Sequence, residues 1–220
     1  MEKKEAYRHI LPHFQKPGQA YFVTWLLKDA IPAKSLVRYT LQLKIINSQI
    51  DLFKTQTADQ SVIDNLKIEY NLVRKKYIKA FHDQLDNARN PYIDLSRQEN
   101  TQIIIQTLQY WEGEKLKNIA FSIMPNHVHW VFELFKTDKN GKPVFLQDIL
   151  QSVKRFSAHK INKSECRQGA LWQKESFDTT LRDENHMYYA VRYTLNNPIK
   201  AGLVSEWSNW PGTWNGYTDL

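Results

Sequence analysis

The pattern of apolar and polar positions divides the chain into an early strand, a long helical region and a later region of mixed elements. The segment Tyr21–Leu27 is rich in aromatic and β-branched residues and predicts a strand. Over residues 33–88, apolar positions recur at helical spacing on both sides of the polar stretch Thr55–Gln60, which predicts a helical hairpin. The Asn90–Pro91 step ends this region. The hairpin carries no catalytic constellation, so we interpret it as an insertion or accessory arm.

The later region alternates helices with strands. A helix is predicted over Gln98–Trp111, and alternating apolar positions predict strands over Asn118–Met124 and His127–Leu134. In the first of these strands Ile119, Phe121 and Ile123 are expected on one face. Because the Pro125–Asn126 turn is tight, the two strands are expected to pair antiparallel.

Further along, the apolar positions over Leu146–Ile161, Phe156 among them, form the stripe of an amphipathic helix. Phe177–Leu181 predicts a short strand. Asp183 is a suitable N-cap for a last helix, which we expect to end at the Asn197–Pro198 step. This order of elements predicts an α+β sandwich.

Composition narrows the class of protein. The 220 residues correspond to one domain over 1–220, with the arm over 33–88 inside it and a Trp-rich tail over 205–220. The one cysteine, Cys166, argues against a disulfide framework and a cysteine-rich zinc module and suits a reducing compartment. No apolar run approaches the roughly 18 residues of a membrane span, and the first residues lack the apolar core of a secretion signal. We therefore expect a soluble, cytoplasmic protein without a membrane partner.

The charge adds a hint about partners. A formal net charge of +7 favours an anionic partner without identifying one. Basic side chains gather around the end of the helix that begins at Leu146, where Glu165 alone opposes them: Lys154, Arg155, Lys160, Lys163 and Arg167. This cluster is either a solvated helix face or a set of anion contacts, and its pattern leaves both interpretations open.

Two histidines stand out in the second of the paired strands. His127 and His129 are two residues apart, so both side chains point to one face. The opposite face is entirely apolar and is expected to face the core: Val128, Trp130, Phe132 and Leu134. The histidines therefore lie on the less apolar face, where a metal ion or a phosphate could approach. The spacing alone is weak evidence, because a His-x-His pair also arises by chance.

The last helix contains a candidate nucleophile. At about 100° per residue, its apolar positions form one stripe that we expect to be buried: Met187, Tyr188, Val191 and Leu195. Tyr193 falls nearly opposite that stripe, with Tyr189 and Asn197 about 40° to either side. It is either a surface tyrosine whose ring covers other residues or a phenol nucleophile beside Asn197. Tyr189 and Tyr188 are the rival nucleophiles.

A phenol needs assistance to act as a nucleophile, because the free group has a pKa near 10. A divalent ion on the histidine pair would polarise a phosphate oxygen, stabilise the developing charge and favour phenolate nearby. The histidines and a tyrosine together therefore predict attack on a phosphodiester, which gives a covalent phosphotyrosine and frees a sugar hydroxyl.

Three ordered blocks resemble the REP-associated tyrosine transposases, which are relatives of single-strand transposases in the HUH endonuclease superfamily. The blocks read MPNHVHWVFEL, GALWQKESFDTTLRDE and YTLNNPIKAGLV, and the early YFVTWLLKD is similar to that family's first strand. They cover more than half of the chain and leave out the region over 33–88, which the most compact members lack.

The resemblance implies a ferredoxin-like antiparallel sheet flanked by helices, with the helical hairpin inserted. It implies that His127 and His129 are the metal pair, that Tyr193 is the nucleophile of a Y-x-x-x-N-P pattern, and that Asn197 is the third metal ligand. Mg²⁺ or Mn²⁺ is the implied ion. Thr194 stands where the family often has isoleucine.

The implied substrate is single-stranded DNA folded into short imperfect palindromes, cleaved beside the hairpin through a 5′-phosphotyrosine. Relatives act as monomers or as dimers that share active sites, so a homodimer stays open. The resemblance favours phosphate contacts for the basic helix, with Asn126 and Arg182 added by position. Trp172 either stacks on an unpaired base or packs in the fold, and the tail tryptophans are expected to pack. The DNA-binding set is Lys154, Arg155, Lys160, Lys163, Asn126, Trp172 and Arg182.

Three functions follow from these features. The first is a metal-dependent, tyrosine-nucleophile single-stranded DNA endonuclease and strand transferase. The second is a catalytically silent hairpin-DNA-binding protein derived from such a transposase, which would need no intact set of His127, His129, Tyr193 and Asn197. The third is a two-histidine metal hydrolase of small molecules, which would leave the basic helix and Tyr193 without a role.

Overall fold

The computed structural model describes all residues except 1–5, 9–11, 31–35, 57–58, 88–91 and 218–220. It divides into two compact units, one formed by Met1–Ala30 with Arg89–Leu220 and the other by Ile31–Ala88. Among the described residues, no helix is both long enough and apolar enough to cross a membrane.

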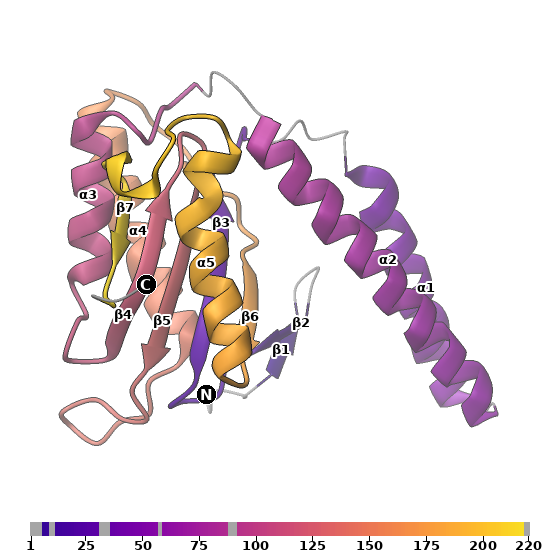
Figure 1. The fold of residues 1–220 in the computed structure, drawn as a ribbon. Coiled ribbons are helices and arrows are strands. Elements are labelled where there is room, and N and C mark those ends of the chain that lie inside the picture. The colour runs from indigo at the N-terminus through magenta and orange to yellow at the C-terminus, as the bar shows by residue number, and fades with distance from the viewer. Residues whose placement is uncertain (1–5, 9–11, 31–35, 57–58, 88–91, 218–220) are drawn as a thin grey trace. The chain divides into compact units, whose positions relative to one another are not determined.

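A five-stranded sheet forms the centre of the first unit (Figure 1). Its strands are β3 (Ala20–Leu26), β4 (Leu116–Ile123), β5 (His127–Leu134), β6 (Phe177–Leu181) and β7 (Thr213–Asn215). They are ordered β6-β3-β5-β4-β7, and every neighbouring pair is antiparallel. The predicted pairing of the two strands around the Pro125–Asn126 turn is therefore confirmed.

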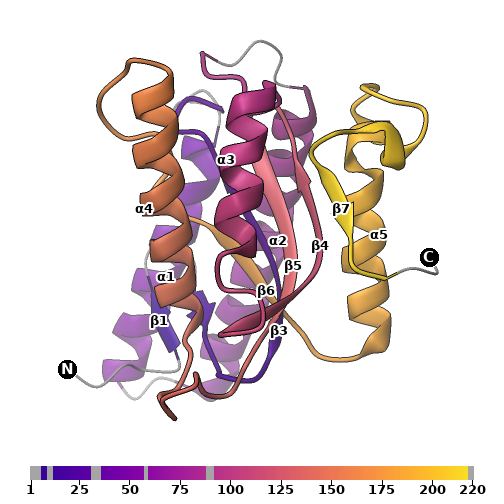
Figure 2. The ribbon, with the colours of Figure 1, turned by 90° about the vertical axis from the view of Figure 1, so that its left-hand side faces the viewer.

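Helices cover both faces of the sheet. Figure 2 shows α3 (Gln98–Gln109) and α4 (Leu146–Ser164) on one side and α5 (Glu184–Lys200) on the other. The chain order β3-α3-β4-β5-α4-β6 and the sheet order β6-β3-β5-β4 are those of a ferredoxin-like fold, with β7 added at the edge. The expected α+β, ferredoxin-like architecture is confirmed.

The second unit is a helical hairpin. It consists of α1 (Val37–Thr55) and α2 (Gln60–Asn87), which pack against each other on either side of the polar stretch found in the sequence. The buried apolar residues of α1 are Leu43, Ile46 and Ile50, at the spacing of one helical face.

Three short elements complete the first unit. Strands β1 (Ala6–Arg8) and β2 (Pro12–Phe14) pair antiparallel, and η1 (Trp207–Asn209) is one turn of 3₁₀ helix before β7. The tail packs onto the sheet as expected, because Trp210 Nε1 donates to the carbonyl of Ile123 at 2.8 Å and the Trp214 ring stacks on Phe121.

The two faces of β5 are both buried. The apolar face behaves as predicted, and the less apolar face that carries the histidines is buried as well: His127 is 1% exposed and His129 0%. α5 packs over that side, where an apolar cluster surrounds the histidines' strand: Ile119, Ala120, Val131, Leu181, Ala190, Val191 and Leu195.

A β-bulge changes the predicted faces of β4. The register shifts between Asn118 and Ala120, so the strand carries one extra residue there. Ile119 consequently packs with Ala120 in the cluster under α5 instead of sharing a face with Phe121 and Ile123.

The buried arc of α5 is also rotated from the prediction. Tyr188 is 46% exposed, whereas Ala190, Thr194 and Asn197 are buried. Two of these three are polar, so a hydrophobic stripe marks only part of the buried surface. Tyr193 consequently lies at the edge of the buried arc and is half-buried.

Both ends of α5 have clear caps. At the start, Asp183 Oδ1 accepts from the backbone N–H of His186 at 2.8 Å, as predicted. The predicted end is wrong by part of a turn, since the helix runs through Pro198 to Lys200. It ends in a Schellman motif: Gly202 has φ +69° and donates to Ile199 O, and Leu203 donates to Pro198 O.

On α4, one predicted core residue is exposed. Phe156 has 48% of its surface exposed, and the ammonium of Lys160 lies 5.5 Å from its ring centroid. The buried positions are Leu146, Ile149, Leu150, Val153, Ser157 and Ile161.

Candidate active site

The candidate site is built on the central strands, where β5 pairs with β3. His129 lies opposite Thr24 in the register, and His127 lies opposite Leu26. The turn before His127 is held by backbone bonds from Leu27 N to Asn126 O at 2.9 Å and from Met124 N to His127 O at 2.8 Å. The two imidazoles therefore project from rigid backbone.

Each imidazole is oriented by a side-chain oxygen at Nδ1. His127 Nδ1 lies 2.6 Å from Asn126 Oδ1, and His129 Nδ1 lies 2.8 Å from Thr24 Oγ1. The two Nε2 atoms are 3.0 Å apart, and the rings meet edge to face at 78°. Both Nε2 atoms thus converge on one point, with their Nδ1 atoms already engaged.

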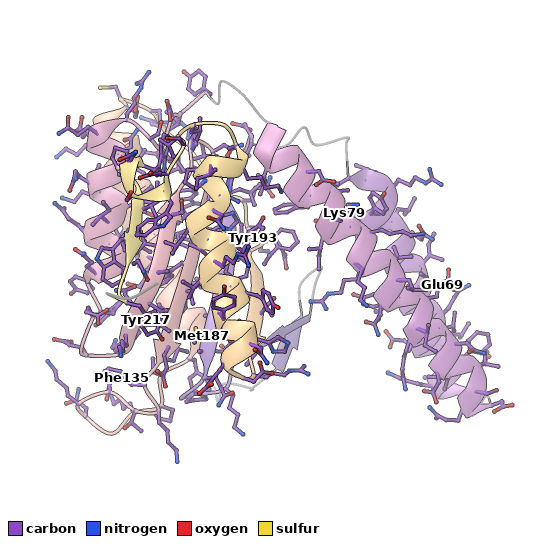
Figure 3. All side chains as sticks on the ribbon, in the orientation of Figure 1. Glu69, Lys79, Phe135, Met187, Tyr193 and Tyr217 are labelled. Carbon is purple, nitrogen blue, oxygen red and sulfur yellow. The ribbon has the colours of Figure 1, made fainter. Side chains whose placement is uncertain are left out.

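Tyr193 brings a phenol ring to this pair from α5. Its ring centroid lies 5.2 Å from that of His129 and 5.7 Å from that of Phe22, and Phe22 itself stacks on His129 at 5.6 Å. Figure 3 places Tyr193 midway along α5, on a different turn from Met187.

The rival tyrosines have other surroundings. Tyr188 and Tyr189 are 46% and 64% exposed, and their rings contact each other at 5.5 Å. Among the described residues, Tyr193 is the one of the three candidate tyrosines whose ring contacts a histidine of the pair.

Asn197 follows Tyr193 by one helical turn. It is 1% exposed, and neither its Oδ1 nor its Nδ2 has a hydrogen-bond partner among the residues that the structure describes. A buried amide that lacks partners is costly, by about 1–3 kcal/mol for one polar group. Its presence here is typical of a site that a ligand completes.

The residues present fit a divalent ion. The 3.0 Å between the two Nε2 atoms matches two adjacent ligands of an octahedral ion with bonds of about 2.1 Å, whose separation is about 3.0 Å. Among the described residues no group of three or more His, Cys, Asp and Glu could hold a metal. The third ligand that the family resemblance implies is the amide oxygen of Asn197. Two imidazoles and an amide oxygen leave positions for phosphate or water, as a catalytic site requires.

The basic helix lies elsewhere. Arg155, Lys160 and Lys163 are exposed on α4, which covers the face of the sheet opposite α5. Arg182 is exposed just after β6, next to the N-cap of α5. The fold therefore does not bring the α4 residues together with Tyr193.

Lys154 differs from its basic neighbours. Its ammonium donates to the carbonyls of Gln173 and Lys174 and to Ser176 Oγ, at 2.7, 3.2 and 3.1 Å. Burial lowers the pKa of Lys154 to about 8, and the nearby carboxylate of Glu175 opposes that shift. The expectation of an outward phosphate contact is thus corrected: Lys154 holds the segment that leads into β6.

Two further predicted contacts lie inside the fold. Trp172 is 7% exposed, its Nε1 donates to Ser157 Oγ at 3.0 Å, and its ring meets Trp25 edge to face. Trp172 therefore packs in the fold, which is one of the two alternatives that the sequence left open. Asn126 is 2% exposed and bonds His127, so it is a neighbour of the histidine site and not a surface contact.

Sequence reasoning missed several residues around the site. Thr24 and Phe22 lie in the predicted strand Tyr21–Leu27, and only the pairing of β3 with β5 places Thr24 opposite His129 and Phe22 on the same face. Arg192 and Lys200 line a pocket along α5 together with Tyr193 and Asn197. The available signal for Lys200 was its spacing of two turns from Tyr193, whereas Arg192 directly precedes Tyr193 and no such spacing marks it.

One of the comparisons with known proteins agrees with the sequence blocks. No model of a known protein family matches the chain. A curated Haemophilus influenzae protein named "Putative REP-associated tyrosine transposase" is 25% identical over 113 residues, which are 48% of this chain and 61% of that relative. The matched part thus spans about three fifths of the relative's length.

A solved structure was also found: a REP-associated tyrosine transposase bound to a REP hairpin, with a TM-score of 0.46, 16% identity, 97% coverage of this chain and 82% of that one. The curated relative confirms the resemblance that the sequence blocks gave: the chain is similar to the REP-associated tyrosine transposases.

Proposed function

We propose that the protein is a metal-dependent single-stranded DNA endonuclease and strand transferase that acts beside hairpins. The observation that carries the proposal is the convergence of Tyr193 with the histidine pair. Its ring lies 5.2 Å from that of His129, and the unpartnered amide of Asn197 follows one turn later on the same helix. A tyrosine that only packs in the fold would need neither neighbour.

In this proposal Tyr193 is the nucleophile. The phenol gives its proton to solvent, and its oxygen forms a bond to the phosphorus of the scissile phosphodiester. The bond from phosphorus to O3′ breaks, and the departing oxygen takes a proton to become a free 3′-hydroxyl. The 5′-phosphate stays on Tyr193, and attack by a 3′-hydroxyl reverses the step and rejoins a strand.

His127, His129 and Asn197 would hold Mg²⁺ or Mn²⁺. The bound ion would polarise a non-bridging phosphate oxygen and stabilise the charge that develops in the transition state. The surrounding residues orient the reacting side chains and exclude water. Phe22 packs on His129 and Tyr193, and α5 lies over the histidines and limits the access of water to them.

The hairpin is proposed to bind through exposed basic side chains. Arg155, Lys160 and Lys163 on α4 and Arg182 beside α5 are placed to contact phosphates, which set position and orientation and do not read sequence. Because α4 lies across the sheet from α5, the DNA would have to pass around an edge of the sheet.

A covalent-adduct assay tests the proposal. The protein is incubated with Mn²⁺ and a labelled single-stranded library of short palindromes, and a denaturing gel separates any protein–DNA band for sequencing. Wild type should give a band that a chelator prevents. The band should disappear in Tyr193→Phe and fall by about a thousandfold or more in the double variant His127→Ala with His129→Ala.

The matched control is Tyr189→Phe, because Tyr189 is an exposed tyrosine on the same helix. That variant should form adduct like wild type. Adduct that survives in Tyr193→Phe would transfer the nucleophile to another tyrosine. Hairpin binding without any adduct would favour the catalytically silent DNA-binding protein.

A further inference from the structure

Two side chains contact the Nδ1 atoms of the histidine pair, and they differ in whether they can donate a hydrogen bond. Asn126 Oδ1 is a carbonyl oxygen, which accepts hydrogen bonds and cannot donate them. Thr24 Oγ1 is a hydroxyl, which does either. Both residues are buried, at 2% and 0% exposed, so water does not substitute for them easily.

The asymmetry assigns the protons on both rings. Since Asn126 Oδ1 only accepts, His127 Nδ1 carries the proton, and His127 Nε2 therefore carries a lone pair. His129 Nε2 lies 3.0 Å from that lone pair, a distance at which two lone pairs repel. In the protein without an ion, His129 Nε2 must then carry a proton and donate it to His127, while His129 Nδ1 accepts from the Thr24 hydroxyl.

Ligation of an ion requires a different tautomer. Two metal-binding imidazoles both need a lone pair at Nε2 and a proton at Nδ1. His127 already has that form. His129 has to give its Nε2 proton to solvent and take one up at Nδ1, with no net change in protons, and the Thr24 hydroxyl has to rotate from donor to acceptor.

We propose that Asn126 and Thr24 are positioning residues with separate tasks, and that this inference rests on the proposed metal site. Asn126 is a fixed acceptor that keeps His127 ready for an ion. Thr24 is a reversible partner that lets His129 Nε2 donate to His127 when no ion is present and carry a lone pair when one binds. Both Nδ1 atoms consequently keep a hydrogen-bond partner in both states.

Imidazole ¹⁵N shifts of the ion-free protein test the assignment directly, because they distinguish protonated from lone-pair nitrogens. His127 should show a protonated Nδ1, and His129 a protonated Nε2. Added Mg²⁺ should move the proton of His129 to Nδ1 and leave that of His127 in place. A protonated His127 Nε2 in the ion-free protein would overturn the inference, whether or not the enzyme cleaves DNA.

Mn²⁺ affinity, measured by electron paramagnetic resonance of the free ion, tests the consequence. Thr24→Val should weaken binding about 10- to 100-fold, and Thr24→Ser should restore it to within a few-fold. Asn126→Ala should weaken binding similarly, whereas Asn126→Asp keeps an acceptor and should not. Thr107→Val is the matched control, because Thr107 is equally buried and bonds only within α3, to Ile103 O.

The two failures are distinguishable. Wild-type affinity in Thr24→Val, with wild type itself binding Mn²⁺, overturns the role of Thr24 and leaves the proposed function intact. If wild type does not bind Mn²⁺, the proposed function has no metal ion. The proton shift on His129 that the ion would drive is then overturned as well. Equal weakening in Thr107→Val would attribute the effect to general loosening and would also overturn the inference.

Discussion

Two buried asparagines on opposite sides of the sheet differ in whether their side-chain amides are hydrogen-bonded, and that difference separates a structural residue from a candidate ligand. Asn118, on the side of α3 and α4, uses its whole amide: Oδ1 accepts from Trp130 Nε1 at 2.6 Å, and Nδ2 donates to Leu108 O and Glu112 Oε2. Asn197, on α5, has neither atom paired among the described residues. Both are almost fully buried, so burial alone does not separate them.

The difference extends to the neighbours of each residue. On the α3 and α4 side, Ser157 and Thr107 donate to carbonyls of their own helices, and the Lys154 ammonium is surrounded by carbonyls. On the α5 side, two imidazoles meet through nitrogens that can both carry lone pairs. Single unpaired atoms occur on the α3 and α4 side as well, at Trp25 Nε1, Asn100 Oδ1 and Asn162 Oδ1. Asn197 differs from them because both of its amide atoms lack a partner among the described residues, which makes it a candidate ligand.

Replacing each asparagine by leucine should give changes of opposite sign, and this is the largest effect we expect. Asn118→Leu leaves the Trp130 indole N–H buried without an acceptor and should lower the free energy of unfolding by about 2–4 kcal/mol. Asn197→Leu removes an unpaired amide and should raise it by about 1 kcal/mol. Urea unfolding in chelator-treated buffer measures both.

Adduct formation by the two variants should follow the opposite order to their stability. Asn197→Leu is expected to lose Mn²⁺-dependent adduct although it is the more stable protein. If Asn197→Leu is destabilised as much as Asn118→Leu, Asn197 is a structural residue and the contrast between the two faces disappears.

Basic residues of one helix, α4, also contrast in how they are used, and salt dependence measures this. Arg155 and Lys163 are exposed, whereas Lys154 is bound to carbonyls. If both exposed residues contact phosphates, the double variant Arg155→Ala with Lys163→Ala should lower the slope of log K against log salt by about 1.4–1.8. Lys154→Met should leave the slope unchanged. The probe is a labelled oligonucleotide that folds into a short imperfect palindrome, and a flattened slope in Lys154→Met would return that lysine to the DNA interface.

Much of this site was predictable, because strand parity and helical spacing place side chains on elements. That reasoning made His127 with His129 and Tyr193 with Asn197 candidates, with Tyr188 and Tyr189 as rivals, and the family resemblance singled them out. What spacing does not show is which layers cover an element. The sequence gives no sign that α5 lies over the histidine face, since His127 and His129 look polar but are buried with Val131.

Other misses have equally local causes. The bulge at Ile119 adds one residue and reverses the parity of the strand before it. Thr194 and Asn197 bury polar atoms, so the apolar stripe understated the buried arc of α5. The Lys154 side chain is long enough to reach backbone carbonyls some twenty residues away in the sequence, which no pattern along one helix records.

The smallest expected effect concerns the pH dependence of stability through Lys154. Its pKa in the folded protein is about 8, below the ordinary value of 10.5, because burial disfavours the charged form. Between these two values the unfolded chain binds more protons than the folded one, so the free energy of unfolding should rise as the pH rises from about 8 to 10.5. Below pH 8 the ammonium is charged in both states, and this contribution is at its minimum. The difference between the two pKa values corresponds to at most about 3 kcal/mol. We expect a smaller rise, of about 1 kcal/mol relative to Lys154→Met, because the carbonyls of Gln173 and Lys174 stabilise the ammonium. Urea unfolding of both proteins from pH 7 to 10.5 measures the difference, and parallel curves would show that the carbonyls of Gln173 and Lys174 compensate the charge fully.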